Sequence, residues 1–256
     1  MSKSMSPEEL KKHCEKATSA LGGILKNFSE SQHEKFKKRA MLIAYWVKTY
    51  VRYINKEDSF SPQSVYRLKR GSVVLVEFGY RVGRELGGRH YAVVLDANNS
   101  IYRNTVTVVP LGSIKEKEDK KAFRLELRDG VYKPVLNKLA ALKDESSSIM
   151  REVDEMEKTI ATANPADISK LRTVQRAKAE QAKVLAAQAE EWNEEIDHMK
   201  AGSAALVDQV TTISKMRITQ PLKKTHPLYG IRLSAQDMDA IDNELKKLFF
   251  QSQKNV

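Results

Sequence analysis

The feature that most limits the fold of this chain is a pair of heptad repeats in its second half. Apolar residues recur at alternating spacings of four and three over residues 135–160, and again over residues 168–199. The sequence Asn-Pro-Ala-Asp at residues 164–167 separates the two series. Two heptad series with a turn between them predict an antiparallel coiled-coil hairpin. At about 1.5 Å per residue, arms of about 30 residues would each project roughly 45 Å.

The register of this hairpin follows from folding the second series back onto the first. Ile160 is then paired with Ile168 near the tip, and Leu142 with Leu185 near the base. Some predicted core positions are polar, which lowers stability but can fix the register. These positions hold Ser146, Gln175 and Lys178. We expect residues 133–200 to behave as a separable arm, whose removal leaves the rest of the chain folded.

Short runs rich in β-branched residues lie on both sides of the hairpin. Before it they occupy residues 72–78, 91–95, 105–109 and 123–127, bounded by glycine and asparagine turns. After it, strand-like sequence resumes at residues 206–213 and 216–218. Short strands with glycine turns predict a small antiparallel barrel. The hairpin therefore interrupts one β domain.

Helical sequence flanks this β domain at both ends. Residues 6–9, Ser-Pro-Glu-Glu, form a capping box with proline at the first helical position. The glycine pair at residues 22–23 is expected to end this first helix. A second helix is predicted over about residues 32–54, and a last helix after the capping motif at residues 234–237.

These patterns together predict an α+β protein in three parts. Residues 1–58 are an N-terminal helical extension. Residues 70–130 and 203–250 form a small antiparallel β-barrel, and the last part of this range is the C-terminal helix. Residues 131–202 are the inserted coiled-coil hairpin.

The formal net charge of the 256 residues is +11, and most of the excess lies near the N-terminus. Residues 1–70 contain 15 Lys and Arg against 7 Asp and Glu. This excess favours a polyanionic partner, with nucleic acid ahead of an acidic membrane surface. The same basic excess can also serve solubility alone. The second helix combines basic residues with Tyr45, Tyr50 and Tyr53. Such a face could bind single-stranded RNA or simply be solvated.

Several classes of protein are excluded or disfavoured by what the sequence lacks. The apolar run at residues 40–47 is too short to span a membrane, and residues 1–6 lack the apolar region of a signal peptide. The single cysteine, Cys14, excludes a disulfide framework. We therefore expect a cytoplasmic protein that does not bind membranes. The scattered histidines and the absence of a phosphate-binding glycine loop predict neither a metal nor a cofactor.

Four short motifs follow one another through the predicted β domain. A strand opens with Arg-Gly at residues 70–71, and a glycine-rich loop ends in Gly-Arg-Glu-Leu-Gly-Gly-Arg at residues 83–89. Another strand ends in Pro-Leu-Gly-Ser at residues 110–113, and a late segment over residues 209–218 completes the series. In this order they resemble the PemK/MazF family of toxins. The resemblance covers about residues 70–128 and 203–250, and so excludes the N-terminal helices and the hairpin.

The resemblance implies a half-open barrel of the Src-homology-3 type. Proteins of this family are typically dimers that cleave single-stranded RNA, such as mRNA, without a metal. In this family a ribose 2′-hydroxyl attacks the adjacent phosphate, and an antitoxin protein neutralises the toxin. Arg89 aligns with the catalytic arginine, whose guanidinium can bind two phosphate oxygens at once. Arg89 could instead be a rim arginine that pairs with Glu85. The resemblance also suggests RNA contacts from Glu85, Gln209, Thr212, Lys215 and Arg217, although Gln209 and Thr212 could equally maintain the fold and the dimer surface.

Two positions depart from the family pattern. His90 replaces the usual proline and could carry a proton, although neighbouring strand residues point to opposite faces. Gly112 replaces the usual threonine, so we expect Ser113 to supply the hydroxyl, provided that the strand breaks at Gly112. The same substitution leaves open a non-catalytic RNA-binding or regulatory module that kept the fold. A third hypothesis is a structural protein whose hairpin binds a partner.

Overall fold

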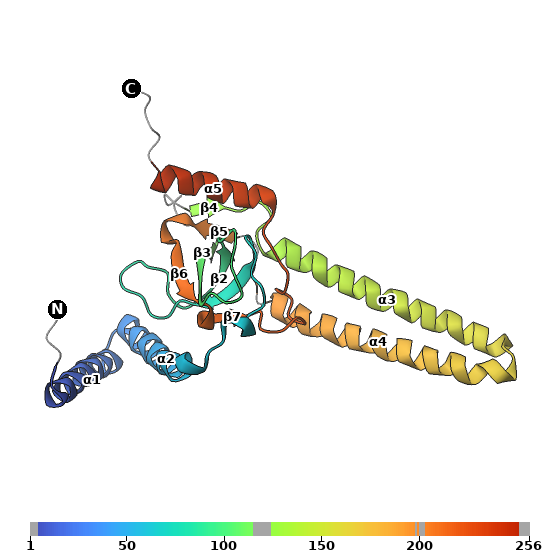
Figure 1. Cartoon of the computed structure of the whole chain (residues 1–256), viewed down its shortest axis with the longest axis horizontal. Helices are drawn as coiled ribbons and strands as arrows, with labels where there is room; N and C mark the ends of the chain where they lie inside the picture. The colour runs from blue at the N-terminus through green and yellow to red at the C-terminus, as the bar shows by residue number, and fades with distance from the viewer. Residues whose placement is uncertain (1–4, 115–123, 198, 200–202, 251–256) are drawn as a thin grey trace, which may run out of the picture. The chain divides into compact units, whose positions relative to one another are not determined.

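The computed structural model describes residues 5–114, 124–197, 199 and 203–250 (Figure 1). The α-helices are α1 (Pro7–Ser29), α2 (Glu34–Lys56), α3 (Tyr132–Thr162), α4 (Pro165–Asp197) and α5 (Ala235–Phe249). The strands are β1 (Val73–Glu77), β2 (Arg89–Val94), β3 (Thr105–Ser113), β4 (Arg124–Glu126), β5 (Ser203–Leu206), β6 (Thr211–Ser214) and β7 (Ile218–Gln220). The chain divides into two units, Met1–Phe60 with Phe78–Gly88, and Ser61–Glu77 with Arg89–Val256.

The first unit contains α1, α2 and the loop at residues 78–88. The capping box at residues 6–9 forms as predicted, with both of its reciprocal hydrogen bonds. The expected helix end at the glycine pair 22–23 is wrong, because α1 continues past it. Phe28, in the last turn of α1, packs on Phe36 of α2 with ring centroids 5.1 Å apart. This contact helps to offset the roughly 1 kcal/mol that each interior glycine costs a helix.

The seven strands of the second unit form one antiparallel sheet in the order β4-β5-β3-β2-β1-β7, with β6 also paired with β3. In β1 and β2, Val73 lies opposite Val93 and Glu77 lies opposite Arg89. In β2 and β3, Val93 lies opposite Val109. The path ends at β4 on one side and at β7 on the other, so the sheet does not close. The predicted α+β fold with a half-open antiparallel barrel is confirmed.

The chain after the hairpin differs from the predicted continuous strand over residues 206–213. β5 and β6 are separate strands, and a 3-10 turn, Val207–Gln209, lies between them. β5 pairs with residues 111–113 of β3, and β6 pairs with residues 105–108. Because β3 advances by fewer residues than its partner between these two ladders, the extra residues form the turn.

Other strand ends also differ from the prediction. β3 is longer than predicted and extends to Ser113. The strand predicted at residues 216–218 begins only at Ile218, because Lys215–Arg217 form a further 3-10 turn. Phe123, the first residue of the predicted fourth strand, lies outside the described residues.

α3 and α4 form the helical hairpin that the heptad pattern predicts, inserted between the paired strands β4 and β5 (Figure 1). Ser146 Oγ donates a hydrogen bond to the Ala182 carbonyl oxygen at 2.9 Å, and Gln175 Nε2 donates to the Val153 carbonyl oxygen at 3.4 Å. Both bonds fit the expected register. Lys178 forms an ion pair with the facing helix. The polar residues of the seam therefore bind across the hairpin.

Both faces of the sheet are buried at its centre. On one of them, here called the hairpin face, Val73, Val93 and Val109 share a hydrophobic cluster with Leu139 of α3 and Trp192 of α4. The same cluster includes residues of α5. On the other, here called the opposite face, four side chains are 0 % exposed: Val74, Val76, Ala92 and Val94. Both faces of the sheet therefore contribute residues to the buried core.

The base of the hairpin belongs to this core, which argues against the expectation that residues 133–200 form a separable arm. Trp192 is 4 % exposed, and its Nε1 donates to the Thr225 carbonyl oxygen at 2.7 Å. Lys138 Nζ lies 4.7 Å from the Trp192 ring centroid and donates to the Tyr229 carbonyl oxygen at 2.7 Å. These contacts join both arms to the segment that precedes α5. Periodicity does not reveal this role, because seam residues and core residues of a helix recur at the same spacing.

Candidate active site

Arg89, Glu77 and Arg217 meet at the end of the β1–β2 pair. Arg89 is the first residue of β2 and lies opposite Glu77, the last residue of β1. Arg217 Nε donates a hydrogen bond to the Glu77 carbonyl oxygen at 2.9 Å. The Arg89 side chain is exposed, whereas Glu77 and Arg217 are half-buried. An exposed guanidinium beside a second one that is held in place suits the binding of a phosphate group.

Tyr91 shares the hairpin face with Arg89, because residues two apart in a strand point the same way. Burial raises the pKa of the Tyr91 hydroxyl, with a further contribution from Glu195 of α4, while the positive charge of Arg89 acts in the opposite direction. The sequence analysis does not single out Tyr91, although strand alternation alone places it on the same face as Arg89.

The strand does not break at Gly112, and that expectation is wrong. Gly112 pairs with Ala204 and Ser113 pairs with Ser203, and the Arg124 guanidinium donates to the Ser113 carbonyl oxygen. A Cβ atom at position 112 would lie 3.2 Å from Arg124 Nη2, so a threonine there would crowd this guanidinium.

The regular register nevertheless places Ser113 on the same face of the sheet as Arg89. Val93 and Val109 are directly paired and so share a face. Counting by twos leads from Val93 to Arg89 along β2, and from Val109 to Ser113 along β3. The hydroxyl that we expected on the Arg89 side needs no turn to reach it.

His90 lies on the opposite face. It pairs with Val76, which is 0 % exposed, and it alternates with Ala92 on the same side of β2. Its imidazole and the Arg89 guanidinium therefore project from different faces of the sheet. This arrangement does not favour a shared phosphate for the two residues.

The predicted RNA-contacting residues of the late segment separate into different environments. Lys215 is 1 % exposed, its Nζ donates to the Ser100 carbonyl oxygen at 2.8 Å, and burial lowers its pKa. This favours a structural role over RNA contact. Thr212 Oγ1 lies 3.2 Å from Thr107 Oγ1, and Gln209 is in the 3-10 turn. Of this group, Arg217 is the residue that the structure joins to the Arg89 strand pair.

Glu85 belongs to the loop at residues 78–88 in the first unit. It forms an ion pair with Arg81 at 3.6 Å. The Phe78 amide donates to the Gly88 carbonyl oxygen, and the Gly88 amide donates to the Gly79 carbonyl oxygen, each at 2.8 Å. These two bonds close the neck of the loop at the residue before Arg89.

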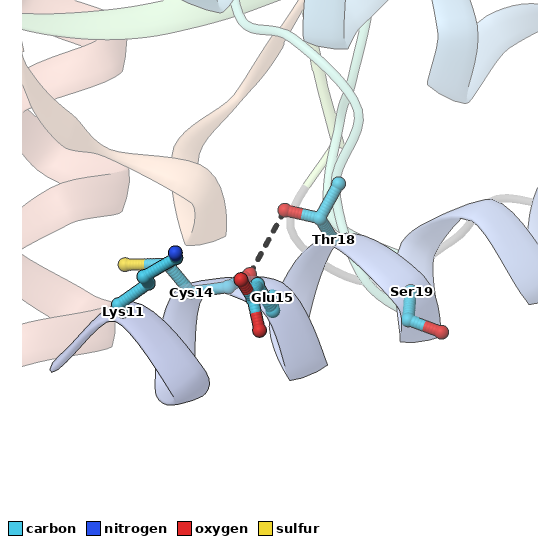
Figure 2. Close-up of a pocket in the computed structure, with 5 residues that line it drawn as sticks. All are labelled: Lys11, Cys14, Glu15, Thr18 and Ser19. Atoms are coloured by element: carbon cyan, nitrogen blue, oxygen red, sulfur yellow. Dashed lines mark hydrogen bonds between the residues drawn. The ribbon is translucent and has the colours of Figure 1, made fainter. Parts of the chain in front are cut away.

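Two surface depressions of the described residues have no arginine in their linings. One lies on α1 alone and is lined by Lys11, Cys14, Glu15, Thr18 and Ser19 (Figure 2). In it, Thr18 Oγ1 donates to the Cys14 carbonyl oxygen at 2.9 Å, which is ordinary helix bonding. Across the described residues, no group of three His, Cys, Asp or Glu side chains is placed to hold a metal ion.

A second depression lies beside α4 and contains His226. His226 Nε2 lies 2.9 Å from Glu195 Oε1, and its Nδ1 accepts from the Leu228 amide at 3.1 Å. Both ring nitrogens are therefore engaged, which indicates a structural histidine.

Part of the chain that contains the sheet and Arg89 is similar to a known family of proteins. Residues 69–178 match the model of a family described as PemK-like, MazF-like toxin of type II toxin-antitoxin system. The chain carries a PemK/MazF toxin domain. The match begins just before β1, takes in β1 to β4 and α3, and ends inside α4.

The later strands lie beyond the matched range but belong to the same sheet. β5 and β6 pair with β3, and β7 pairs with β1, so the sheet that holds the matched strands is completed after the hairpin. No curated protein matches the chain. Among the described helices of the structure, none has the length and apolar character to cross a membrane.

Proposed function

We propose that the PemK/MazF domain is a metal-independent endoribonuclease that cleaves single-stranded RNA. The observation that carries this proposal is the placement of Arg89, exposed at the start of β2 beside Glu77 and Arg217. A planar, permanently charged guanidinium can bind two oxygens of a phosphate and stabilise the negative charge that develops on it. The basic net charge of +11 supports an anionic substrate.

The proposed reaction uses the RNA's own nucleophile. The ribose 2′-oxygen loses its proton and forms a bond to the adjacent phosphorus, and the bond from phosphorus to the 5′-oxygen breaks. The products are a cyclic phosphate and a 5′-hydroxyl that has gained a proton. Arg89 would bind the phosphorane oxygens, and Ser113, on the same face of the sheet, would donate a hydrogen bond to a phosphate oxygen or to the leaving oxygen.

The family also suggests the partners of the domain. The matched family is defined within type II toxin-antitoxin systems, so we propose that a cognate antitoxin protein neutralises this chain. We further propose that the chain acts as a homodimer in the cytoplasm. Gln209, Thr212 and Glu85 remain proposed RNA contacts, whereas the burial of Lys215 argues against this role for that residue.

A second candidate function is a non-catalytic RNA-binding or regulatory module. The observation that favours it is Gly112, which stands where the family has a threonine and brings no side chain to the site. In that case Arg89 and Arg217 would bind phosphate without a hydroxyl to assist cleavage.

Incubation of the purified chain with single-stranded RNA in excess EDTA separates the two. Cleavage that leaves cyclic-phosphate and 5′-hydroxyl ends supports the endoribonuclease. Binding without cleavage across a pool of RNA sequences supports the module. A chain that neither binds nor cleaves RNA would contradict both candidate functions.

A further inference from the structure

The N-terminal helices lie outside the match to the PemK/MazF family, yet α2 makes a close contact with the loop at residues 78–88. Gly79 has a φ of +74°, and a Cβ atom built on it would lie 2.6 Å from three atoms of the Trp46 indole, Cδ2, Cε2 and Cε3. Real Cβ atoms do not come this close to a ring. The indole therefore rests directly on the backbone of Gly79, and both the conformation and the contact require glycine there.

Gly79 is part of the closed neck of this loop. Its carbonyl oxygen accepts the Gly88 amide, and the Phe78 amide donates to the Gly88 carbonyl oxygen. A Cβ atom on Gly87 would lie 2.6 Å from the Gly79 carbonyl oxygen, so the backbone at Gly87 also packs closely on the backbone of Gly79. Arg89, the proposed catalytic residue, is bonded directly to Gly88 in the sequence. One peptide bond thus separates the neck from Arg89.

Trp46 is itself held in position by its neighbours. Its ring stacks on Tyr50 with centroids 5.6 Å apart, and lies 6.3 Å from the ring of Tyr53. A second tether joins α2 to the loop, because Arg39 Nε donates to the Tyr80 hydroxyl at 3.0 Å. The loop is consequently fastened to α2 at two consecutive residues, Gly79 and Tyr80.

We propose that Trp46 is a positioning residue, which fixes the neck of the 78–88 loop on α2 and thereby sets the backbone from which Arg89 projects. This inference rests on the proposed endoribonuclease function. Misplacement of a catalytic group by about 1 Å can lower a rate by about 100-fold. A helical extension outside the matched family range would then be required for full activity of the PemK/MazF domain.

The first test compares Trp46→Ala and Trp46→Phe with a matched control, Met41→Ala, in the full chain. Met41 is another residue of α2 and is 49 % exposed. Single-turnover cleavage should fall about tenfold or more in Trp46→Ala, recover partly in Trp46→Phe and stay near wild type in Met41→Ala. Affinity for an RNA that carries a 2′-deoxy nucleotide at the cleaved position should change little, because Trp46 acts on Arg89 placement and not on binding.

The second test does not depend on cleavage. Hydrogen exchange of the Phe78 and Gly88 amides should be faster in Trp46→Ala and in Gly79→Ala than in wild type, while exchange in β3 stays unchanged. If the wild type cleaves RNA and Trp46→Ala cleaves it equally fast, the positioning role is overturned and the proposed function stands. A wild-type chain that does not cleave RNA would remove the function. If hydrogen exchange at the Phe78 and Gly88 amides is unaltered in both variants, Trp46 does not fix the neck of the loop.

Discussion

Arg217 donates a hydrogen bond from Nε to the main-chain oxygen of Glu77, which is the residue directly opposite Arg89 in the sheet. The bond joins the turn before β7 to the end of β1, at the point where the β1–β2 pair begins. Arg217 therefore supports the strand end that lies opposite the proposed catalytic residue. Its own guanidinium adds positive charge at the same place.

Replacement of Arg217 by methionine tests this support. The hydrogen bond to Glu77 is lost while much of the apolar stem is kept, so the free energy of unfolding should fall by about 1–2 kcal/mol. We expect RNA cleavage to fall by about tenfold, because the end of β1 is no longer fixed opposite Arg89. Urea unfolding and single-turnover cleavage measure the two effects. A variant that keeps both wild-type values would remove Arg217 from the site.

Arg89 itself should tolerate no substitution. Arg89→Lys keeps the charge but loses the two-point contact with phosphate, and we expect a drop of about 10²–10³-fold in the cleavage rate. Arg89→Ala should be at least as impaired. Arg67→Lys, at an exposed position of the same unit, serves as the control. Full activity of Arg89→Ala would show that the reaction is carried out elsewhere.

The hydroxyl of Ser113 is the feature on which catalysis, as distinct from binding, depends. Ser113→Ala should lower the cleavage rate by about tenfold or more. Affinity for 2′-deoxy-substituted RNA, measured by fluorescence anisotropy, should be within a few-fold of wild type. If Ser113→Ala cleaves as fast as wild type, the assignment of this hydroxyl is wrong.

The hairpin should tolerate a deletion of its outer part but not a deletion that includes its base. Deletion of residues 149–179 with a short Gly/Ser turn retains the Ser146–Ala182 hydrogen bond and the cluster around Trp192. We expect this variant to keep the β signal in circular dichroism, because closure entropy depends weakly on loop length. Deletion of residues 132–201 removes Leu139 and Trp192 from the core and should unfold the sheet, as loss of one large core side chain alone costs about 3–5 kcal/mol. A folded product of the longer deletion would contradict the core role of the base.

His226 makes the stability of the second unit depend on pH. Burial lowers its pKa despite the opposing effect of Glu195, while Lys138 adds to the lowering and Glu191 opposes it. The unfolded chain therefore takes up a proton on this residue at higher pH than the folded chain does. Its contribution to stability is present above the unfolded pKa of about 6.5 and is lost as the pH falls below it.

Thermal unfolding between pH 7.5 and pH 5 measures this effect. The melting temperature of the wild type should decrease toward pH 5, and His226→Gln should show a smaller decrease. His13→Gln, on the exposed face of α1, is the control and should follow the wild type. Identical slopes for wild type and His226→Gln would exclude His226 as the source.

Local patterns were sufficient to predict most of the elements. The heptad spacing gave the hairpin and the positions of Ser146 and Gln175 across it, because a seam is a property of one helix pair. Runs of valine predicted β1 to β3, because strand propensity is a property of each short segment. The glycine pair 22–23 does not end α1, which continues to Ser29, and Phe28 in its last turn packs on Phe36 of α2.

The site was harder to predict because its geometry depends on pairing between strands. The position of Ser113 on the Arg89 face follows from the Val93–Val109 pair, which no spacing within β3 reveals. Lys215 resembles a surface cation in sequence, but the fold buries its ammonium group against a carbonyl oxygen. The contact between Trp46 and Gly79 links residues that no local motif connects.

The place where the hairpin enters the sheet leaves its length free to vary. Glu126 of β4 lies opposite Ala204 of β5, so the chain leaves and returns on neighbouring strands. Adding or removing the same number of heptads in both arms would move the tip without changing either end. Chains that carry the same insertion can therefore differ widely in arm length while their sheets superimpose, and the reach of the tip can change in evolution independently of Arg89.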